Sequence, residues 1–244
     1  MKGTLRIGTS GIVLPGSKET FPKEFQSGTR LTYYSSLFNT LEINSTFYKL
    51  PLPTTFMKWS SEVDEDFQFT CKLPKIITHC KSLRYHREDI DLFMKASKGV
   101  GEKRGCLLVQ FPASVHAGNN KQIEEILKRL STLNENPKWK ICIEFRDMRW
   151  YDEDSMLKIL DELHVAIVLH DIIDSRTPLH LAGDPVYVRF HGPEGDYKGG
   201  YSEAILESYA LMIKDWLLHK DVYVYFNNTI GNAFKNAQFL KTLI

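Results

Sequence analysis

The chain lacks the features that mark metal-cluster or membrane proteins. Its four cysteines have neither CxxC nor any other metal-ligand spacing, and three of them fall in apolar, strand-like segments where a reduced thiol packs as a small hydrophobe. No apolar run is long enough to cross a bilayer, and the first residues contain no apolar signal core. We therefore expect a soluble, cytoplasmic protein without a membrane partner.

The chain also lacks an excess of charge and any repeat, low-complexity segment or linker. It has 31 basic and 30 acidic residues, a formal net charge of +1, so no global field attracts nucleic acid and any electrostatic preference is local. Hydrophobic residues make up 43% of the 244 residues and charged residues 25%, which is typical of a globular chain with a sizeable core. We expect one domain over residues 1–244.

Short β-rich segments recur along the chain and alternate with helical patterns. The predicted strands are 5–9, 38–44, 66–73, 105–111, 139–145, 165–170, 186–191 and 221–226. The predicted helices are 119–133, 152–163, 202–218 and 232–244, with weaker patterns at 29–37, 53–63 and 88–98. The segment 172–185 has no helical pattern.

Eight strands alternating with helices over this length predict a single TIM-type (β/α)8 barrel of the α/β class, irregular because a helix is missing after the sixth strand. Two alternatives remain. An open doubly wound sheet would need a glycine-rich phosphate turn after an early strand, and "GTSG" at 8–11 is too short for one. A mixed α/β domain with fewer true strands is the other.

Strand alternation separates a helix-facing set from an inward-facing set. One face of most strands is apolar, as in Leu107, Val109 and Phe111, and we expect it to pack on the helices. The opposite face is predicted to look into the barrel; it comprises Thr40, Glu42, Asn44, Gln68, Thr70, Lys72, Cys106, Leu108, Gln110, Lys140, Cys142, Glu144, Arg146, Tyr187, Arg189, His191, Tyr223, Tyr225 and Asn227. In the sixth strand, we expect Asp171 to face inward with Ile167 and Leu169, and His170 to face the helices.

The inward set brings ionisable residues to the C-terminal ends of the strands, where barrel active sites lie. The acids are Glu42, Glu144 and Asp171, and the permanent cations are Lys72, Arg146 and Arg189. Buried charges must be paired, hydrated or bound to a ligand. The balance of signs also permits a purely structural ion-pair network.

A second local signal is the segment "KLPKIITHCKSLRYHR" at 72–87, which contains five basic residues and two histidines but no acid. It follows the third strand, so we expect it at the mouth of the barrel. It is either a solvated basic turn or an electrostatic funnel for an anion.

With these segments in place, the chain resembles the YecE-like family, a domain of unknown function. The blocks that carry the resemblance are "IGTSG" (7–11), "FNTLEINSTFYKLP" (38–51), "FQFTCKLPKIITH" (67–79), "LLVQFP" (107–112), "IEFRDMRW" (143–150), "YVRFHG" (187–192) and "VYVYFNNT" (222–229). The resemblance runs nearly end to end and implies a TIM-type barrel, but the family has no settled reaction.

The family's motif positions correspond here to Glu42, Asn44, Tyr48, Lys72, His79, Gln110, Glu144, Arg146, Trp150, Asp171, Arg189, His191 and Asn227. Two departures concern one wall of the expected pocket. The family usually has aromatics shortly after the first "GTSG", where this chain reads "IVLPGSKETF", and Asp147 stands where a histidine often follows the arginine of the fifth-strand motif.

These residues favour an enzyme, a hydrolase or lyase, that acts by acid/base chemistry on a small anionic or phosphate-bearing substrate. Glu42, Glu144, Asp171 and His191 are the predicted catalytic residues, since carboxylates and histidine transfer protons near neutral pH. The predicted substrate-binding residues are Asn44, Tyr48, Lys72, His79, Gln110, Arg146, Arg189 and Asn227. No cofactor is expected, because no cofactor fingerprint is present.

Two alternatives belong to other classes. A metal-dependent phosphodiesterase or nuclease would use a divalent metal, but the cations beside each acid compete with such an ion. A non-enzymatic protein could bind nucleic acid or another anion through the basic segment, in which Tyr85 is the main aromatic. A Ser-His-Asp triad is weaker still, because no nucleophile elbow surrounds Ser10. The oligomeric state is left open.

Overall fold

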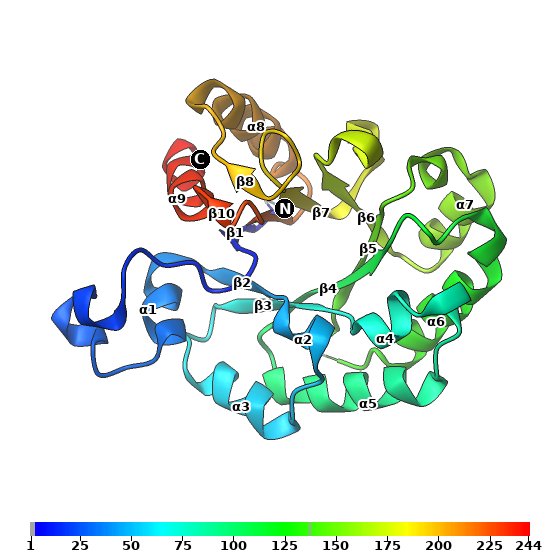
Figure 1. Ribbon diagram of the computed structural model, residues 1–244, viewed down its shortest axis with the longest axis horizontal. Helices are drawn as coiled ribbons and strands as arrows, with labels where there is room; N and C mark the ends of the chain where they lie inside the picture. Colours follow the sequence, from blue (N-terminus) through cyan, green and yellow to red (C-terminus); the bar gives the residue numbers. More distant parts are fainter. Residues whose placement is uncertain (1–2, 137) are drawn as a thin grey trace.

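The computed structural model describes residues 3–136 and 138–244. Its centre is a parallel eight-stranded sheet, which Figure 1 shows. The strands are β1 (Leu5–Thr9), β2 (Thr40–Ile43), β3 (Gln68–Lys72), β4 (Arg104–Phe111), β5 (Lys140–Phe145), β6 (Ala166–His170), β7 (Ala182–Phe190) and β9 (Val222–Phe226). Each predicted strand is present. The seventh begins earlier than expected, at Ala182.

The sheet curves into a nearly closed barrel. Its order is β1-β9-β7-β6-β5-β4-β3-β2, so β1 and β2 are the two edges that must meet. A single parallel bridge joins them, between Ser10 and Glu42, and the backbone N–H of Gly11 donates to the carbonyl of Glu42 at 2.8 Å. The last seam of the barrel therefore lies at the C-terminal end of β2.

Most of the helices cover the outside of the barrel (Figure 1). In the described part of the chain the helices are α1 (Arg30–Leu37), α2 (Ser45–Tyr48), α3 (Pro53–Ser61), α4 (Lys75–Thr78), α5 (Arg87–Ser97), α6 (Asn120–Leu133), α7 (Asp154–Glu162), α8 (Glu203–Trp216) and α9 (Ala233–Leu243). The segment 172–185, expected to be a loop, contains two 3-10 turns, Ile173–Ser175 and Leu179–Leu181, and the start of β7.

Local sequence explains these helices. In α6, Ile123, Ile126, Leu127 and Leu130 recur on one face and are fully buried, because residues three and four apart lie on the same side of a helix. The N-terminus of α8 is capped by Ser202, whose hydroxyl accepts from the backbone N–H of Ile205 at 3.4 Å.

Most of the buried hydrophobic residues form two cores, one between strands and helices and one inside the barrel. The outer core contains the residues that alternation assigns to the helix-facing side. The inner cluster comprises Cys106, Leu108, Cys142, Ala166, Val168, Tyr187, Tyr223 and Tyr225. The thiols of Cys71, Cys106 and Cys142 are free and buried in strands, as expected.

The predicted facing of β6 was wrong. Ile167 and Leu169 belong to the outer core and Val168 to the inner cluster. His170 shares the face of Val168, and its ring lies 5.8 Å from that of His191. Both faces of this strand are apolar, so alternation alone gives no direction. Asp171 follows the last residue of the strand.

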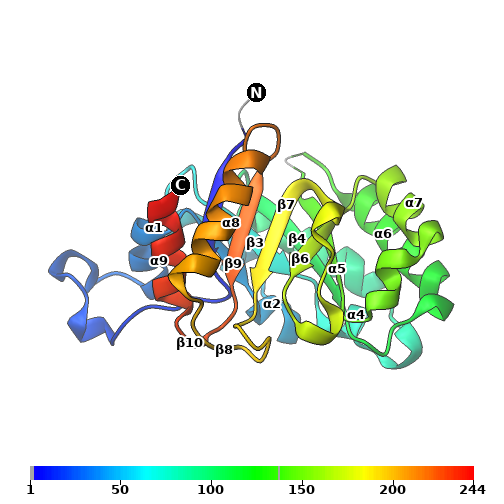
Figure 2. The same ribbon diagram turned by 90° about the horizontal axis from the view of Figure 1, so that it is seen from above.

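Two short strands order the loops at the C-terminal end of the barrel. β8 (Lys198–Gly199) pairs in parallel with β10 (Ile230–Gly231), which ties the loop after β7 to the loop after β9. Figure 2 shows α2, α4, β8 and β10 at one end of the barrel and the N-terminus at the opposite end. None of the helices in the described residues is both long enough and apolar enough to span a bilayer.

Candidate functional site

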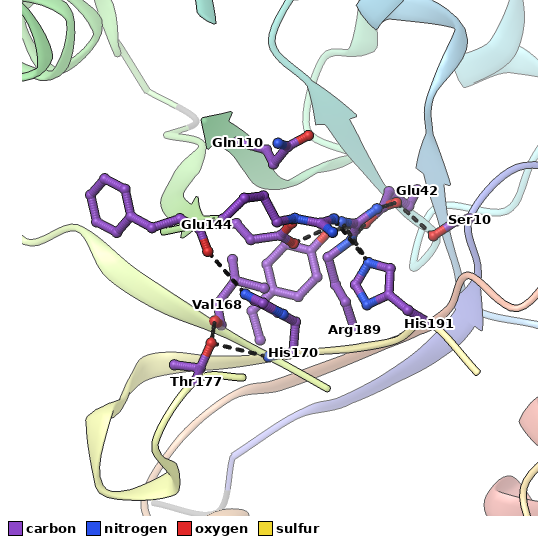
Figure 3. Close-up of polar contacts among 12 residues, drawn as sticks. Ser10, Glu42, Gln110, Glu144, Val168, His170, Thr177, Arg189 and His191 are labelled. Atoms are coloured by element: carbon purple, nitrogen blue, oxygen red, sulfur yellow. Dashed lines mark hydrogen bonds and ion pairs between the residues drawn. The ribbon is translucent and has the colours of Figure 1, made fainter. Parts of the chain in front are cut away.

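Arg189, on β7, is the centre of a buried charged network (Figure 3). Its Nε and Nη2 donate to the two carboxylate oxygens of Glu42 at 2.9 and 2.8 Å, and its Nη1 donates to Glu144 Oε2 at 2.7 Å. The three side chains are at most 1% exposed. The surrounding carboxylates raise the pKa of Arg189 well above its ordinary value despite its burial. The guanidinium is therefore a fixed cation.

Glu42 has no free carboxylate oxygen for a reaction. Besides Arg189, Oε1 accepts from Ser10 Oγ at 2.6 Å and Oε2 accepts from the Tyr187 hydroxyl. Burial raises the pKa of Glu42, but the Arg189 charge and these hydrogen bonds outweigh it, so the pKa is lowered. A carboxylate with four donors and a lowered pKa is a poor base, and this geometry favours a role in holding Arg189.

Glu144, at the end of β5, bridges two arginines. Its Oε1 accepts from Arg146 Nε at 2.6 Å, while Oε2 accepts from Arg189. Burial raises the pKa of Glu144, and the charges of Arg146 and Arg189 more than reverse that effect, leaving it well below its usual range. Glu144 thus remains ionised at neutral pH and orients both guanidinium groups.

His191 is held between two arginines and Asp171. Arg189 Nη1 and Arg146 Nη2 each lie 3.2 Å from its Nε2; since guanidinium groups only donate, Nε2 accepts and the imidazole is neutral. Its Nδ1 then donates to Asp171 Oδ1 at 3.3 Å. Burial lowers the pKa of His191, against the opposing effect of Asp171. Asp171 also accepts from the hydroxyl of Tyr201, so it anchors this ring.

His170 lies near the network although we expected it to face the helices. Its Nε2 donates to the carbonyl of Phe145 at 3.0 Å and lies 3.1 Å from the Tyr151 hydroxyl, while its Nδ1 is buried without a partner among the described residues. Burial lowers the pKa of His170 to about 4. It is a neutral neighbour of the network rather than a charged member.

A pocket of about 300 Å³ opens above the network at the C-terminal ends of the strands; we call it the rim pocket. It is lined by Ser10, Asn44, Phe47, Tyr48, Lys72, Arg146, Arg189, Tyr197, Asn227 and Thr229. Six of the eight predicted substrate-binding residues line it. Its lining includes three cationic side chains and no carboxylate, because Glu42 and Glu144 lie beneath the arginines.

Lys72, at the end of β3, differs from the two arginines in having no ion pair in the described part of the chain. Its ammonium lies 4.1 Å from the centre of the Phe47 ring. Burial, followed by the charge of Arg189, lowers the pKa of Lys72 from 10.5 to about 8. An ammonium group with this pKa can both hold an anion and exchange a proton near neutral pH.

His79 and Gln110 are side by side near the pocket without being part of its lining. Gln110 Nε2 lies 3.5 Å from His79 Nε2, and the His79 ring meets Phe47 edge-on at 4.8 Å. Burial and the charges of Lys72 and Arg146 lower the pKa of His79 to about 4. His79 therefore packs against Phe47, and Gln110 contacts His79.

Two amides of the lining have unused hydrogen-bonding groups. The Oδ1 atom of Asn44 is buried and has no partner within the described residues. Asn227 is 8% exposed, and its side-chain amide has no hydrogen-bond partner within the described residues. These amides can donate to or accept from a ligand in the rim pocket.

Three other features of the sequence, Trp150, Asp147 and the basic segment 72–87, do not form part of the rim pocket as a whole. Trp150 is buried, and its indole donates to the carbonyl of Val115 at 2.9 Å. Asp147 binds Arg149 and caps the 3-10 turn Met148–Asp152. The basic segment 72–87 does not act as one surface: Lys72 lines the rim pocket, whereas Arg87 lines a different groove with Tyr85 and residues of α6.

Sequence reasoning did not assign Phe47, Tyr197 or Thr229 to the site. Phe47 precedes Tyr48 in "STFY", so that motif was a usable signal. Tyr197 is reached through a turn in which it adopts φ 69°, and its hydroxyl accepts from Arg146 at 3.4 Å. No sequence period reports such a turn. Within residues 3–136 and 138–244, no three His, Cys, Asp or Glu side chains are grouped so that they could hold a metal ion.

A nearly closed parallel barrel with its polar pocket at the C-terminal strand ends defines the class of TIM-like α/β barrels. The sequence matches the family model described as "Protein of unknown function DUF72" over residues 6–244. The chain belongs to the DUF72 family, as the YecE-like motifs indicated.

Relatives agree with this assignment. The chain is 28% identical over 163 residues to the UPF0759 protein YecE of Escherichia coli K12, a match that covers 66% of this chain and 58% of YecE. The same protein of E. coli O157:H7 gives the same values. The match thus spans less than two thirds of these curated relatives' length.

Solved structures show the same fold. A DUF72 family protein from Enterococcus faecalis V583 superposes with a TM-score of 0.75 at 23% identity, covering 99% of this chain and 98% of that one. A DUF72 family protein from Thermotoga maritima MSB8 gives a TM-score of 0.71 at 23% identity, covering 98% of each chain.

Proposed function

We propose that the rim pocket is the active site of an enzyme that acts on a small anionic or phosphate-bearing substrate. The observation that supports this proposal is the lining itself: Lys72, Arg146 and Arg189 face one pocket of about 300 Å³ that no carboxylate lines. Its volume falls at the lower end of the range for small-molecule sites, about 300–1,000 Å³.

The hydrogen bonds of the network leave donors for an anion. Arg146 uses its Nε on Glu144 and contacts Tyr197 and His191 through its terminal nitrogens, so N–H groups of both terminal nitrogens are unused. Lys72 makes no hydrogen bond within the described residues. A phosphate or carboxylate between these two side chains would accept charge-assisted hydrogen bonds, which are roughly twice as strong as neutral ones.

The same geometry favours catalytic roles for other residues than those predicted from the sequence. Glu42, Glu144, Asp171 and His191 act as positioning residues, because each is occupied by the cations or by its neighbours. Lys72 is the group that transfers a proton, and Arg146 stabilises negative charge that develops during the reaction. Hydrolysis or elimination next to the anionic group fits this set.

Calorimetric titration with inorganic phosphate tests the binding step. The wild type should bind phosphate, and Lys72→Met should lower its affinity by at least tenfold, since one of the cations is lost while the stem is retained. Lys81→Met is the matched control, because Lys81 is exposed and outside the lining. Equal affinity of wild type and Lys72→Met would refute the proposed site.

Turnover is tested separately. Phosphorylated and carboxylated metabolites that raise the thermal midpoint of the wild type are incubated with enzyme, and products are followed by mass spectrometry. Lys72→Met should abolish product formation, and Lys81→Met should leave it unchanged. A substrate that Lys72→Met converts at the wild-type rate would contradict the catalytic role of Lys72.

A further inference from the structure

We infer that the substrate carries an apolar group beside its anionic group, and that this apolar group occupies a second cavity next to the rim pocket. We call it the side cavity; it is lined by Gly11, Ile12, Leu31, Leu41, Ile43, Asn44, Ser45, Trp59 and Phe69. The inference rests on the proposed function, because the anionic group is the one that the rim pocket would hold.

The side cavity has the size and lining for a hydrocarbon group. Its volume is about 260 Å³, whereas an apolar cavity of about 150 Å³ binds benzene. Leu41 and Ile43 reach it from the outer face of β2, and Trp59 from α3. None of the side chains of its lining is charged, so it offers nothing to a second anion.

The linings of the two cavities share a residue at the C-terminal end of β2. Asn44 lines both of them. Ser10 lines the rim pocket, and the next residue, Gly11, lines the side cavity. Gly11 adopts φ +82°, and a Cβ added there would meet no atom within 4 Å, so the turn leaves open space at this junction. One ligand can therefore lie across the end of β2.

Asn44 favours a ligand with a hydrogen-bond donor at the junction of the two cavities. Its Oδ1 is buried and unpartnered within the described residues, and an unsatisfied buried carbonyl oxygen is unfavourable. A hydroxyl or N–H of the ligand would satisfy it. The substrate class is thus an organic phosphate or carboxylate with a hydrogen-bond donor close to the anion and an aryl or short alkyl group beyond it.

Titration with matched probes tests this inference. Inorganic phosphate reports the anionic group alone, and phenyl phosphate adds the apolar group. Wild type should bind phenyl phosphate at least tenfold more tightly than phosphate. Ser45→Phe places a ring at the side cavity and should remove this preference without changing phosphate affinity. Ser36→Phe, on the exposed part of α1, is the control and should retain the preference.

A second variant, Ile12→Ser, tests the same inference if Ser45→Phe does not fold. Ile12→Ser makes the wall of the side cavity polar, and should also weaken phenyl phosphate binding by severalfold at unchanged phosphate affinity. If phosphate binds and phenyl phosphate binds no more tightly, the inference is wrong and the proposed function stands. If the preference persists in both variants, the phenyl group lies elsewhere and the inference is wrong. If neither probe binds, both the proposed function and the inference fail.

Discussion

Removing the charge of Lys72 should make the unliganded protein more stable, although it destroys the proposed site. Burial and the nearby Arg189 lower the pKa of Lys72 from 10.5 to about 8, and one pKa unit corresponds to about 1.4 kcal/mol. Below pH 8, the charged ammonium therefore costs the folded protein about 3 kcal/mol. In Lys72→Met, the apolar stem remains and this cost disappears.

The lost contact with Phe47 reduces the gain. The ammonium lies 4.1 Å from the centre of that ring, and such a cation–π contact contributes about 0.5–2 kcal/mol. The net stabilisation of Lys72→Met is then about 1–2.5 kcal/mol at pH 7, which urea denaturation at low ionic strength resolves. Lys81→Met, on the exposed surface, should change the free energy of unfolding by less than about 0.5 kcal/mol.

The dependence on pH separates this explanation from a packing effect. Between pH 8 and 10.5, folded Lys72 has lost its proton while the unfolded chain keeps it, so wild-type stability rises with pH relative to the variant. The advantage of Lys72→Met should shrink through that window. A variant that is less stable at pH 7, or an advantage that does not change with pH, would refute the reasoning.

Three further predictions concern residues of the charged network and of the pocket wall. Arg189→Met leaves Glu42 and Glu144 buried without their shared cation, so we expect a loss of at least about 3–5 kcal/mol in urea denaturation; a smaller loss would contradict the fixed network. Tyr187→Phe removes a donor to Glu42 and should cost about 1–3 kcal/mol, whereas Tyr48→Phe, which is exposed, should cost nothing measurable. His79, whose pKa is about 4, is neutral in the folded state and takes up a proton on unfolding, so its contribution to stability declines as pH falls from 6.5 to 4; a titration of its ring near pH 6.5 by NMR would contradict this.

The alternation of strands predicted five of the ten residues that line the rim pocket, namely Asn44, Lys72, Arg146, Arg189 and Asn227. The outer faces of β4, β5 and β9, and of β7 from Val186 onward, are apolar at every second position. The inner position of Glu144, Arg146 and Arg189 therefore followed from period two. The same reasoning had no basis in β6, where Ile167, Val168 and Leu169 are all apolar. There the direction is set by packing against neighbouring strands, which a single sequence does not report.

Contacts between loops could not be predicted from the sequence. Tyr197 reaches Arg146 because the chain turns through left-handed conformations at Gly195 and Tyr197 and because β8 pairs with β10. Likewise, the acids were recognised as site residues, but their saturation by arginine, serine and tyrosine donors depends on distances between side chains from different strands. Their assignment as bases was a hypothesis that this geometry does not favour.

Glu42 takes part in two features of the molecule. Its main chain carries the bridge that closes β1 onto β2, and its side chain holds Arg189. Closure of the sheet and the placement of Arg189 thus depend on one residue, so a substitution of Glu42 should affect both. Residues of the rim pocket outside that seam, such as Tyr48 on α2 and Tyr197 and Thr229 in loops, can change without loss of either contact.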